Sequence, residues 1–422
     1  MSPVRPTVQV VGRRLDAEHY RLRDYLTRVA QPYDWLEAGS ADADRLLSSF
    51  GLVDAPLPVV FDGDRTFTAA TFDMLAAAWS THPSPSRSHY DFVVIGAGPA
   101  GLAAAVYAAS DGLSTVVFDR DVPGGQASYA SMIENFFGFP DGIGGAELTR
   151  LAGRQAERFG AELFGLHGVR GSRLASDGDT VGLILDDGSE VSASVVLAAT
   201  GIDWRRLELD GIDELVGHGI YYGAGRSEST QSSGQRVVVV GAGNSAGQAV
   251  LNFANNEAHV TMLVRGDRLG KTMSAYLIGR IEQHPLIDVR LETQLTELHS
   301  SDGTLTGVTF ADAGGNARSD AVDAVFLCIG GKPHTEWCPG EHVLTDAAGY
   351  ILTGQDLLVG GSRPECWQLD RDPLPLETSR VGVFAAGDVR RGSTKRVAAA
   401  VGEGSMVAAL VFSRLAELGV TV

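Results

Sequence analysis

The sequence of 422 residues contains only three cysteines, Cys328, Cys338 and Cys366, and no two of them form a Cys-x-x-Cys pair. A dithiol redox centre and a structural zinc site both need cysteines at short spacing, so the sequence predicts neither and no metal site. Cys328 lies in the apolar run 325–329, which indicates a buried thiol. A redox role for Cys338 or Cys366 stays open, although activating a thiolate requires a basic environment that the sequence does not show.

The sequence also lacks a long hydrophobic run. No stretch reaches the roughly 18 apolar residues that a membrane-spanning helix needs. Residues 1–11 have no apolar core behind a basic cap, so they do not resemble a signal peptide. We therefore expect no membrane association and a cytoplasmic location.

Basic residues are scarce relative to acidic ones. The 34 Lys and Arg residues against 52 Asp and Glu give a formal net charge of −18. Such a charge argues against nucleic acid or an anionic membrane surface as a partner, because phosphate groups would be repelled.

What the sequence does contain is two glycine-rich fingerprints of dinucleotide binding, about 145 positions apart. The first is 93–101 and the second is 237–247, and each follows an apolar strand-like run and opens an Ala-rich helical stretch. In this motif the glycines allow a tight turn beneath a pyrophosphate, and the N-terminus of the helix binds the phosphates. Two fingerprints predict two nucleotides, most simply a flavin and a nicotinamide dinucleotide, and hence electron transfer.

Charged residues after each fingerprint distinguish the two nucleotides. Asp119 ends the strand that follows the first fingerprint, where a carboxylate can accept hydrogen bonds from a ribose. At the corresponding position after the second fingerprint stands Arg265, with Arg268 nearby. A cation there suits the 2′-phosphate of NADP and favours NADP over NAD, whereas the alternative is a solvated surface arginine.

The Pro- and Ser-rich stretch 81–89 predicts a linker after an N-terminal domain of residues 1–80. In that domain we expect strands at 8–11, 33–36 and 57–61 and a helix at 20–29. This order resembles the thioredoxin/glutaredoxin fold, with Pro58 where that fold keeps a cis-proline. The redox pair after the first strand is missing, since 13–20 contains no cysteine. We predict a thioredoxin-like domain with a structural or docking use.

The region from about 90 to 422 resembles the low-molecular-weight thioredoxin reductase family. The matching motifs, in order, are Gly96-x-Gly98-Pro99-Ala100-Gly101, Gly124-Gly125-Gln126, Glu134-Asn135, Ala199-Thr200-Gly201, Gly241-x-Gly243-Asn244-Ser245-Ala246 and Gly387-Asp388. The resemblance implies an α/β fold with two Rossmann-like domains. An FAD-binding domain (90–207 and 332–422) would be split by an inserted NAD(P)H-binding domain (208–331). It also implies a homodimer.

The resemblance carries over to individual residues as candidate FAD and NADPH contacts. Asp388 would bind the ribityl chain of FAD, and the helix that starts at Arg396 would face the flavin with its N–H groups, which stabilise negative charge. The FAD candidates are Gly96, Gly98, Pro99, Ala100, Gly101, Asp119, Gly125, Gln126, Asn135, Thr200, Gly201, Gly387, Asp388, Lys395, Arg396, Val397 and Ala398. The NADPH candidates are Gly241, Gly243, Asn244, Ser245, Ala246, Arg265 and Arg268.

One segment departs from the family. Thioredoxin reductases carry Cys-x-x-Cys just before the second fingerprint, but here 219–228 reads Gly-Ile-Tyr-Tyr-Gly-Ala-Gly-Arg-Ser-Glu. Without that pair the flavin electrons cannot be relayed by thiol–disulfide exchange. The sequence is closer to a cysteine-less bacterial branch that joins the reductase core to an N-terminal domain. Tyr221 and Tyr222 are candidates to face the flavin, or they fill the space of the thiols. The insertion 352–375 is either a lid or partner surface, or a passive loop.

These observations predict an FAD-dependent NADPH oxidoreductase that passes electrons to a non-disulfide acceptor, either a small molecule or a redox protein. A related alternative is a thioredoxin-reductase-type ferredoxin or flavodoxin–NADP reductase, although the acidic chain would slow its encounter with an acidic ferredoxin. A second alternative is a flavin oxidase that acts on a small metabolite with oxygen as acceptor, which the second fingerprint disfavours. A non-enzymatic nucleotide sensor is a third, and the intact flavin motifs disfavour it.

Overall fold

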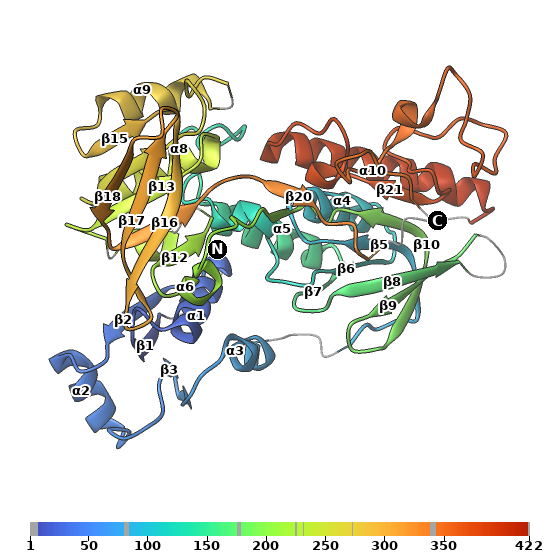
Figure 1. Ribbon diagram of the computed structural model, residues 1–422. Helices are drawn as coiled ribbons and strands as arrows, with labels where there is room; N and C mark the ends of the chain where they lie inside the picture. Colours follow the sequence, from blue (N-terminus) through green and yellow to red (C-terminus); the bar gives the residue numbers. More distant parts are fainter. Residues whose placement is uncertain are drawn as a thin grey trace. The chain divides into compact units, whose positions relative to one another are not determined.

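The computed structural model describes residues 7–79, 84–174, 179–223, 226–230, 232–271, 273–337 and 343–420 (Figure 1). The chain separates into two compact units. One consists of Met1–Ser80, Tyr129–Ser131 and Trp204–Gly330, and the other of Thr81–Ser128, Met132–Asp203 and Gly331–Val422. We refer to an N-terminal domain and a second-fingerprint domain, which together form the first unit, and to a first-fingerprint domain, which forms the other.

The N-terminal domain is a four-stranded sheet of order β2-β1-β3-β4, in which β1 is parallel to β2 and antiparallel to β3. Its helix α1 begins where Asp16 accepts hydrogen bonds from two backbone N–H groups of the first turn, and it buries Leu22 and Leu26. The elements are β1 (Val8–Gly12), α1 (Ala17–Arg28), β2 (Tyr33–Glu37), α2 (Ala41–Ser49), β3 (Val59–Asp62), β4 (Arg65–Phe67) and α3 (Phe72–Trp79).

The strands and the helix expected in this domain are present to within three residues at either end, and the Leu57–Pro58 bond is cis. Helices α2 and α3 were not predicted. Ser40 accepts a hydrogen bond from the N–H of Ala43, so a capping signal for α2 was present in the sequence. Part of the predicted linker, residues 81–83, lies outside the described residues.

The first-fingerprint domain contains a seven-stranded sheet of order β7-β6-β5-β10-β9-β8, with β21 paired to β10. Strands β5, β6, β7, β10 and β21 run parallel, whereas β9 is antiparallel to β10. The elements are β5 (His89–Ile95), α4 (Pro99–Ser110), β6 (Thr115–Phe118), η1 (Gly125–Tyr129), α5 (Gly145–Arg158), β7 (Glu162–Phe164), β8 (Val169–Leu174), β9 (Val181–Leu185), β10 (Glu190–Ala198), η2 (Gly354–Leu357), β21 (Val383–Ala385), η3 (Gly387–Val389) and α10 (Val397–Glu417).

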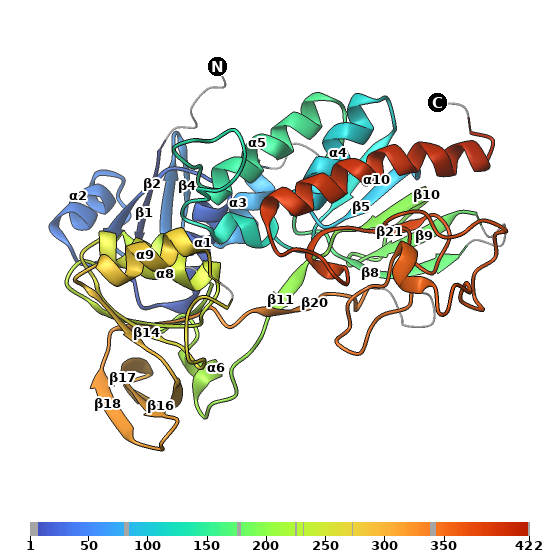
Figure 2. The ribbon, with the colours of Figure 1, turned by 90° about the horizontal axis from the view of Figure 1, so that it is seen from above.

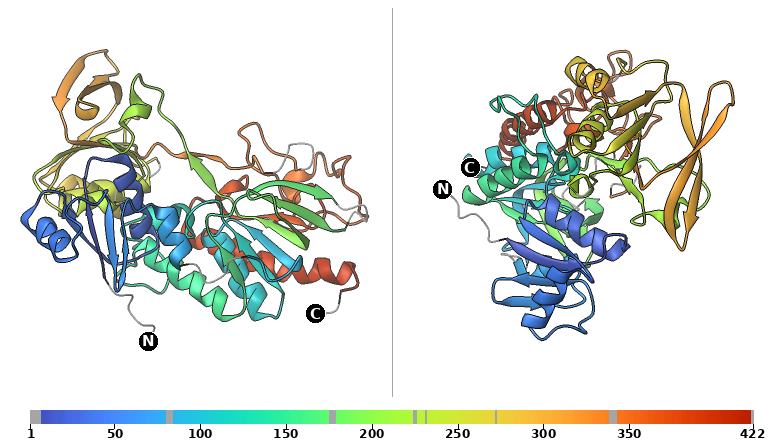
Figure 3. Two further views of the ribbon diagram at one scale, coloured as in Figure 1. Left: turned by 90° about the horizontal axis from the view of Figure 1, so that it is seen from below. Right: turned by 90° about the vertical axis from the view of Figure 1, so that its left-hand side faces the viewer.

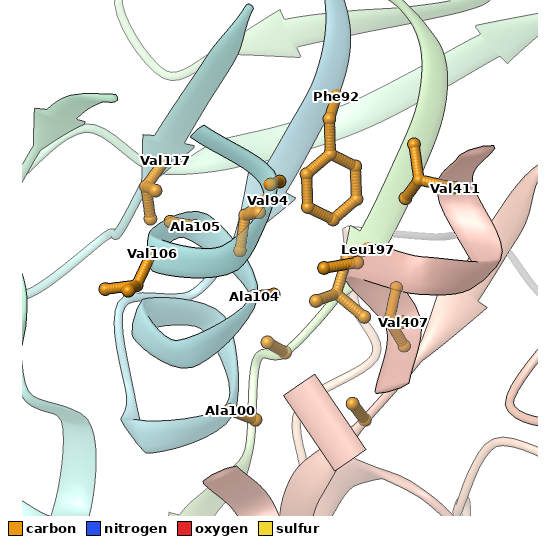
Figure 4. Close-up of a cluster of buried hydrophobic side chains, with 14 of the residues drawn as sticks. Phe92, Val94, Ala100, Ala104, Ala105, Val106, Val117, Leu197, Val407 and Val411 are labelled. Carbon is orange, nitrogen blue, oxygen red and sulfur yellow. The ribbon is translucent and has the colours of Figure 1, made fainter. Parts of the chain in front are cut away.

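The core of this domain lies between its sheet and the helices α4 and α10. Phe92 of β5 and Leu197 of β10 are buried against Val407 and Val411 of α10 (Figure 4). Helices α4 and α10 run side by side (Figure 2), and Gly404 permits the contact because a Cβ there would lie 2.1 Å from the carbonyl oxygen of Ala100 in α4. Among the described residues, α10 is long and apolar enough to cross a membrane by length and composition alone, and 33% of that apolar stretch is buried in the structure.

The second-fingerprint domain is a five-stranded parallel sheet of order β12-β19-β13-β14-β15. Helices α8 and α9 cover one face, and a three-stranded antiparallel sheet, β16-β17-β18, covers the other (Figure 3). The elements are α6 (Ile212–Leu215), β12 (Ile220–Tyr222), α7 (Arg226–Ser229), β13 (Arg236–Val240), α8 (Asn244–Asn255), β14 (His259–Leu263), α9 (Ala275–Gln283), β15 (Ile287–Arg290), β16 (Thr293–Ser301), β17 (Thr304–Asp312), β18 (Ala317–Ala321) and β19 (Ala324–Leu327).

The chain enters the second-fingerprint domain after Asp203 and leaves it after Gly330. At these crossings β11 (Ile202–Trp204) pairs with β20 (Gly331–Pro333) as a two-stranded sheet. The sequence placed the borders of the inserted domain at 208 and 331, close to these positions.

Candidate dinucleotide sites

The first fingerprint forms the turn between β5 and α4. Gly96 has φ +104°, and a Cβ there would lie 2.4 Å from the carbonyl oxygen of Ala199, so only glycine fits. A Cβ at Gly98, in contrast, would meet no atom within 4 Å, so the space beside this residue is open. Helix α4 begins at Pro99 and no side chain caps its N-terminus. Its first N–H groups are therefore available to a phosphate.

Asp119 braces this turn from the end of β6. One carboxylate oxygen accepts a hydrogen bond from the N–H of Ala97 at 2.6 Å, and the other accepts from the N–H of Asp121 at 2.9 Å. A carboxylate has about four acceptor positions, so these bonds leave capacity for a ribose hydroxyl. The predicted ribose role is compatible with the geometry, and the side chain also has a structural role that the sequence did not indicate.

Three further predicted segments meet the first turn. A Cβ at Gly125 would lie 3.1 Å from Cα of Gly98, and one at Gly387 would lie 3.1 Å from Cβ of Ala100. Gly96 of the first turn contacts the segment that contains Thr200. The structure thus brings together, around the N-terminus of α4, residues that are up to about 290 positions apart.

Other predicted residues of this site make local bonds or stand apart. Gln126 donates from Nε2 to the carbonyl oxygen of Ile202 at 2.8 Å. Thr200 donates from Oγ1 to the carbonyl oxygen of His334 at 2.6 Å, and Gly201 accepts from the His334 N–H at 3.1 Å. Asn135 is exposed in a separate loop.

Asp388 and Lys395 form the part of the site contributed by the C-terminal segment. The Asp388 carboxyl is half-buried and makes no hydrogen bond with a described residue, and burial raises its pKa, while Lys395 opposes that shift. The Lys395 ammonium donates to the backbone carbonyl of Asp388 at 2.5 Å and lies 4.3 Å from the ring centroid of Tyr350. Helix α10 follows Arg396, and no side chain caps its N-terminus, at Val397 and Ala398.

The second fingerprint repeats this design between β13 and α8. A Cβ at Gly241 would lie 2.3 Å from the carbonyl oxygen of Cys328, whereas one at Gly243 would meet nothing within 4 Å. Helix α8 begins at Asn244 without a side-chain cap. The Asn244 Oδ1 atom accepts from the N–H of Ser274 at 2.8 Å, which anchors the helix start to the loop before α9. Of the other candidates, Ser245 is exposed and Ala246 is buried.

Arg265 and Arg268 lie just beyond β14, and both are exposed. No described residue forms an ion pair or hydrogen bond with either guanidinium group. The acid between them, Asp267, is paired with Lys271 at 2.8 Å, which lowers the pKa of the Asp267 carboxyl. Both guanidinium groups therefore remain available for an anion such as a ribose phosphate.

A family model for the pyridine nucleotide-disulphide oxidoreductases matches residues 90–404. The chain belongs to this family. It is 31% identical to the thioredoxin reductase of Bacillus subtilis (strain 168) over 78% of this chain and 96% of that protein. It is 33% identical to NADPH-dependent thioredoxin reductase 3 of Arabidopsis thaliana over 82% of this chain, but over only 62% of that longer protein.

Solved structures agree with this assignment. The crystal structure of T. acidophilum thioredoxin reductase covers 78% of this chain and 99% of that chain, with a TM-score of 0.68 and 29% identity. The two Rossmann-like domains predicted from the sequence are therefore confirmed, as is the resemblance to thioredoxin reductase.

Thioredoxin reductases use FAD and NADPH, and the residues of this oxidoreductase fit both cofactors. The observations that support the fit are open space beside Gly98 and Gly243, helix N-termini without side-chain caps, and a half-buried Asp388 carboxyl without a described hydrogen-bond donor. At the NADPH site, the guanidinium groups of Arg265 and Arg268 just beyond β14 are available to bind a ribose phosphate.

The segment that replaces the thiol pair is packed rather than open at Tyr221. This side chain is 3% exposed, and the centroid of its ring lies 5.0 Å from the ring centroid of Phe326 and 4.8 Å from that of Tyr20. Burial raises the pKa of the Tyr221 hydroxyl to about 12. The packing matches the alternative in which Tyr221 fills the space of the thiols, not the flavin-facing role. Tyr222 is half-buried, and its hydroxyl accepts from the N–H of Leu207 at 3.4 Å.

One thiol lies beside this segment. The Sγ atom of Cys328 donates to the carbonyl oxygen of Gly223 at 3.3 Å. Burial raises the pKa of the Cys328 thiol to about 12, so it is not a thiolate at neutral pH and not a nucleophile. Cys366 is a free thiol of the other unit, and Cys338 lies outside the described residues.

No sequence pattern indicated how the N-terminal domain meets this segment. Arg23 of α1 donates to the Glu228 carboxylate of α7 at 2.8 Å, and the two side chains are 1% and 8% exposed. Tyr20, one turn earlier in α1, packs against Tyr221 with the two rings tilted by 51°. The partners are about 200 positions apart, so no local pattern reveals them.

The insertion 352–375 is anchored to the rest of its unit. Arg371 pairs with Glu377, whose side chain is fully buried, and with Glu417 of α10. Trp367 donates from its indole N–H to the backbone carbonyl of Arg371 at 2.7 Å. These bonds match a fixed loop rather than a lid, whereas the partner-surface alternative stays open.

Proposed function

We propose that this protein is an NADPH-dependent FAD oxidoreductase that delivers electrons to a non-disulfide acceptor. The observation that supports this proposal concerns the segment 219–229, which lies where thioredoxin reductases hold their thiol pair. Here it contributes Tyr221 to the domain core, and the thiol beside it, Cys328, is single, buried and protonated. A dithiol relay needs a thiolate that attacks a disulfide, and no such group is present in this segment.

The chain's own residues would hold and orient the two nucleotides. The N-termini of α4 and α8 would bind the pyrophosphates, and Arg265 and Arg268 would bind the 2′-phosphate that distinguishes NADPH from NADH. FAD, when bound, would accept a hydride from NADPH and supply electrons to the acceptor. The uncapped start of α10 would place N–H groups where negative charge develops on reduction.

The acceptor we favour is a small, quinone-like molecule. With a net charge of −18, the protein would repel an acidic redox protein, which slows diffusional encounter. The B. subtilis relative, in contrast, is named for its action on thioredoxin. A flavin oxidase is the weaker alternative, because it has no use for the free Arg265 and Arg268 groups.

Anaerobic mixing of the FAD-loaded protein with NADPH tests the proposal. We expect rapid bleaching of the flavin absorption band, and reoxidation by a quinone such as menadione but not by oxidised thioredoxin. A variant with Cys328, Cys338 and Cys366 all replaced by Ala should bleach and reoxidise at unchanged rates. Absence of bleaching with both NADPH and NADH would exclude the reductase and favour the oxidase. Thioredoxin reduction that disappears in the cysteine-free variant would show that a thiol takes part.

A further inference from the structure

A pocket of about 790 Å³ lies within the first unit, between the N-terminal domain and His218 of the second-fingerprint domain. Arg13, Arg14 and Asp16 line it from the loop between β1 and α1, and Trp35 and Glu37 line it from the end of β2. These are the carboxyl ends of two parallel strands, where open α/β sheets bind ligands. The volume lies within the range of roughly 300–1,000 Å³ that is typical of small-molecule sites.

The acids of this pocket are already engaged by the protein. Asp16 caps α1 and accepts from two backbone N–H groups at 3.0 and 3.2 Å. Glu37 accepts from the N–H of Arg14 at 3.1 Å and from the indole N–H of Trp35 at 3.0 Å. In the described part of the chain, neither carboxylate pairs with the side chain of Arg13 or Arg14.

Arg13 supplies a free cation to the pocket. Its side chain is exposed, and no described residue pairs with its guanidinium group. The Arg14 guanidinium also lines the pocket, and its partner is neutral, because the amide oxygen of Gln235 accepts from its two terminal nitrogens at 2.6 and 2.8 Å. A guanidinium group matches the geometry of a phosphate or a carboxylate, either of which it can bind in a bidentate manner.

Two further side chains of the pocket, His218 and Trp35, indicate which other parts a ligand would have besides its anionic group. The Nδ1 atom of His218 lies 2.8 Å from the carbonyl oxygen of Leu15, and since a carbonyl only accepts, Nδ1 carries the proton. The Nε2 atom of the neutral ring is then an acceptor for a ligand hydroxyl. The indole of Trp35 supplies a flat apolar wall that suits a planar group.

We propose that this pocket binds a small molecule in which a phosphate or carboxylate group is attached to a planar portion. The anion lies on Arg13 and Arg14, and the planar portion lies on Trp35. The pocket shares no lining residue with either dinucleotide site, and the proposal does not depend on the proposed function.

The pocket is directly connected to the segment that replaces the thiols. The backbone carbonyl of Arg14 accepts from the Arg23 guanidinium at 3.0 Å, and the same Arg23 nitrogen donates to Glu228. Helix α1, which begins at the pocket, also presents Tyr20 to Tyr221. A ligand that shifts Arg14 therefore acts on the anchor of the segment 220–229.

Isothermal titration of the full-length, FAD-loaded protein tests the site. Saturating NADP⁺ is present throughout, so that the second fingerprint is occupied. The probes are phenyl phosphate, benzoate and the uncharged control phenol. We expect one or both anions to bind and phenol not to bind, and the preferred anion identifies the ligand class. Arg13→Gln should weaken binding about tenfold or more, the effect of one lost charge-assisted contact.

Two variants make the test specific. Arg45→Gln removes the same charge from the exposed surface of α2 and should leave the affinity unchanged. His218→Ala removes the wall contributed by the second-fingerprint domain and should weaken binding without changing Arg13. Binding that Arg45→Gln weakens as much as Arg13→Gln does would reveal only a general charge effect and overturn the proposal. So would the absence of binding of both anions at millimolar concentration in the wild-type protein. Because the readout is binding, this failure is distinct from a failure of flavin bleaching.

Discussion

The buried ion pair between Arg23 and Glu228 provides the sharpest test of how the N-terminal domain is held. The two side chains are 1% and 8% exposed, and the contact is 2.8 Å long. Glu228→Ala leaves the guanidinium charge in the interior with one backbone acceptor, the carbonyl of Arg14. Removing one partner of a buried pair costs about 3–5 kcal/mol, because the remaining charge stays desolvated. We therefore expect Glu228→Ala to lower the unfolding free energy of the first unit by about that amount.

A double-mutant cycle separates the pair from packing. Arg23→Met keeps apolar contact with Trp35, over which the guanidinium lies at 4.6 Å, but removes the Arg23 partner of the Glu228 carboxylate. The double variant Arg23→Met/Glu228→Leu leaves no buried charge and should recover most of the loss, with a coupling energy of about 2 kcal/mol or more. Urea unfolding measures the energies, and hydrogen exchange of the α1 amides reports release of the N-terminal domain.

The same helix carries a matched control. Glu18 pairs with Arg21 at 2.7 Å, but the two side chains are 64% and 62% exposed. Glu18→Ala should change stability by less than about 1 kcal/mol, as is usual for exposed pairs. Equal costs for Glu18→Ala and Glu228→Ala, or additive effects in the cycle, would refute the idea that α1 is anchored through a buried pair.

Three further predictions concern the nucleotide sites and the thiol-replacing segment. Arg265→Ala should weaken NADPH binding about 10–100-fold and NADH binding little, with the exposed Arg206→Ala as control; equal losses for both nucleotides, measured by titration, would contradict the 2′-phosphate role. Asp388→Asn should raise the melting temperature of the FAD-free protein at pH 7, because burial raises the folded-state pKa of Asp388 and its contribution to stability is lost as the pH rises through that pKa. The gain should shrink as the pH falls towards about 4, the ordinary range of aspartate, and a gain independent of pH would contradict the assignment. Tyr221→Ala should cost about 3–5 kcal/mol of stability by creating a cavity, but Tyr221→Phe less than about 1.5 kcal/mol; similar calorimetric costs for both would show that the ring is not packed as described.

The sequence revealed those features that depend on residues close to one another in the chain. Both fingerprints were identifiable because glycine spacing, the apolar strand and the following helix lie within a few residues. The availability of the Arg265 guanidinium group for an anion was only partly predictable, since it depends on the neighbouring acid Asp267 being paired with Lys271. The choice between two roles for Tyr221 needed the tertiary structure, because filling a core and covering a cofactor require the same type of side chain.

The N-terminal domain contacts the second-fingerprint domain through α1. The β1–α1 loop contains arginines and no cysteine, and the segment 219–229 that α1 contacts contains Tyr221 and Glu228 and no cysteine. The two segments are joined by side-chain and backbone contacts. What connects them is the sequence of contacts from Arg14 to Arg23 to Glu228, in which the last link is a buried ion pair. A ligand on Arg14 acts at the first contact in this sequence, which is why binding in the pocket is expected to change the stability of the segment 220–229.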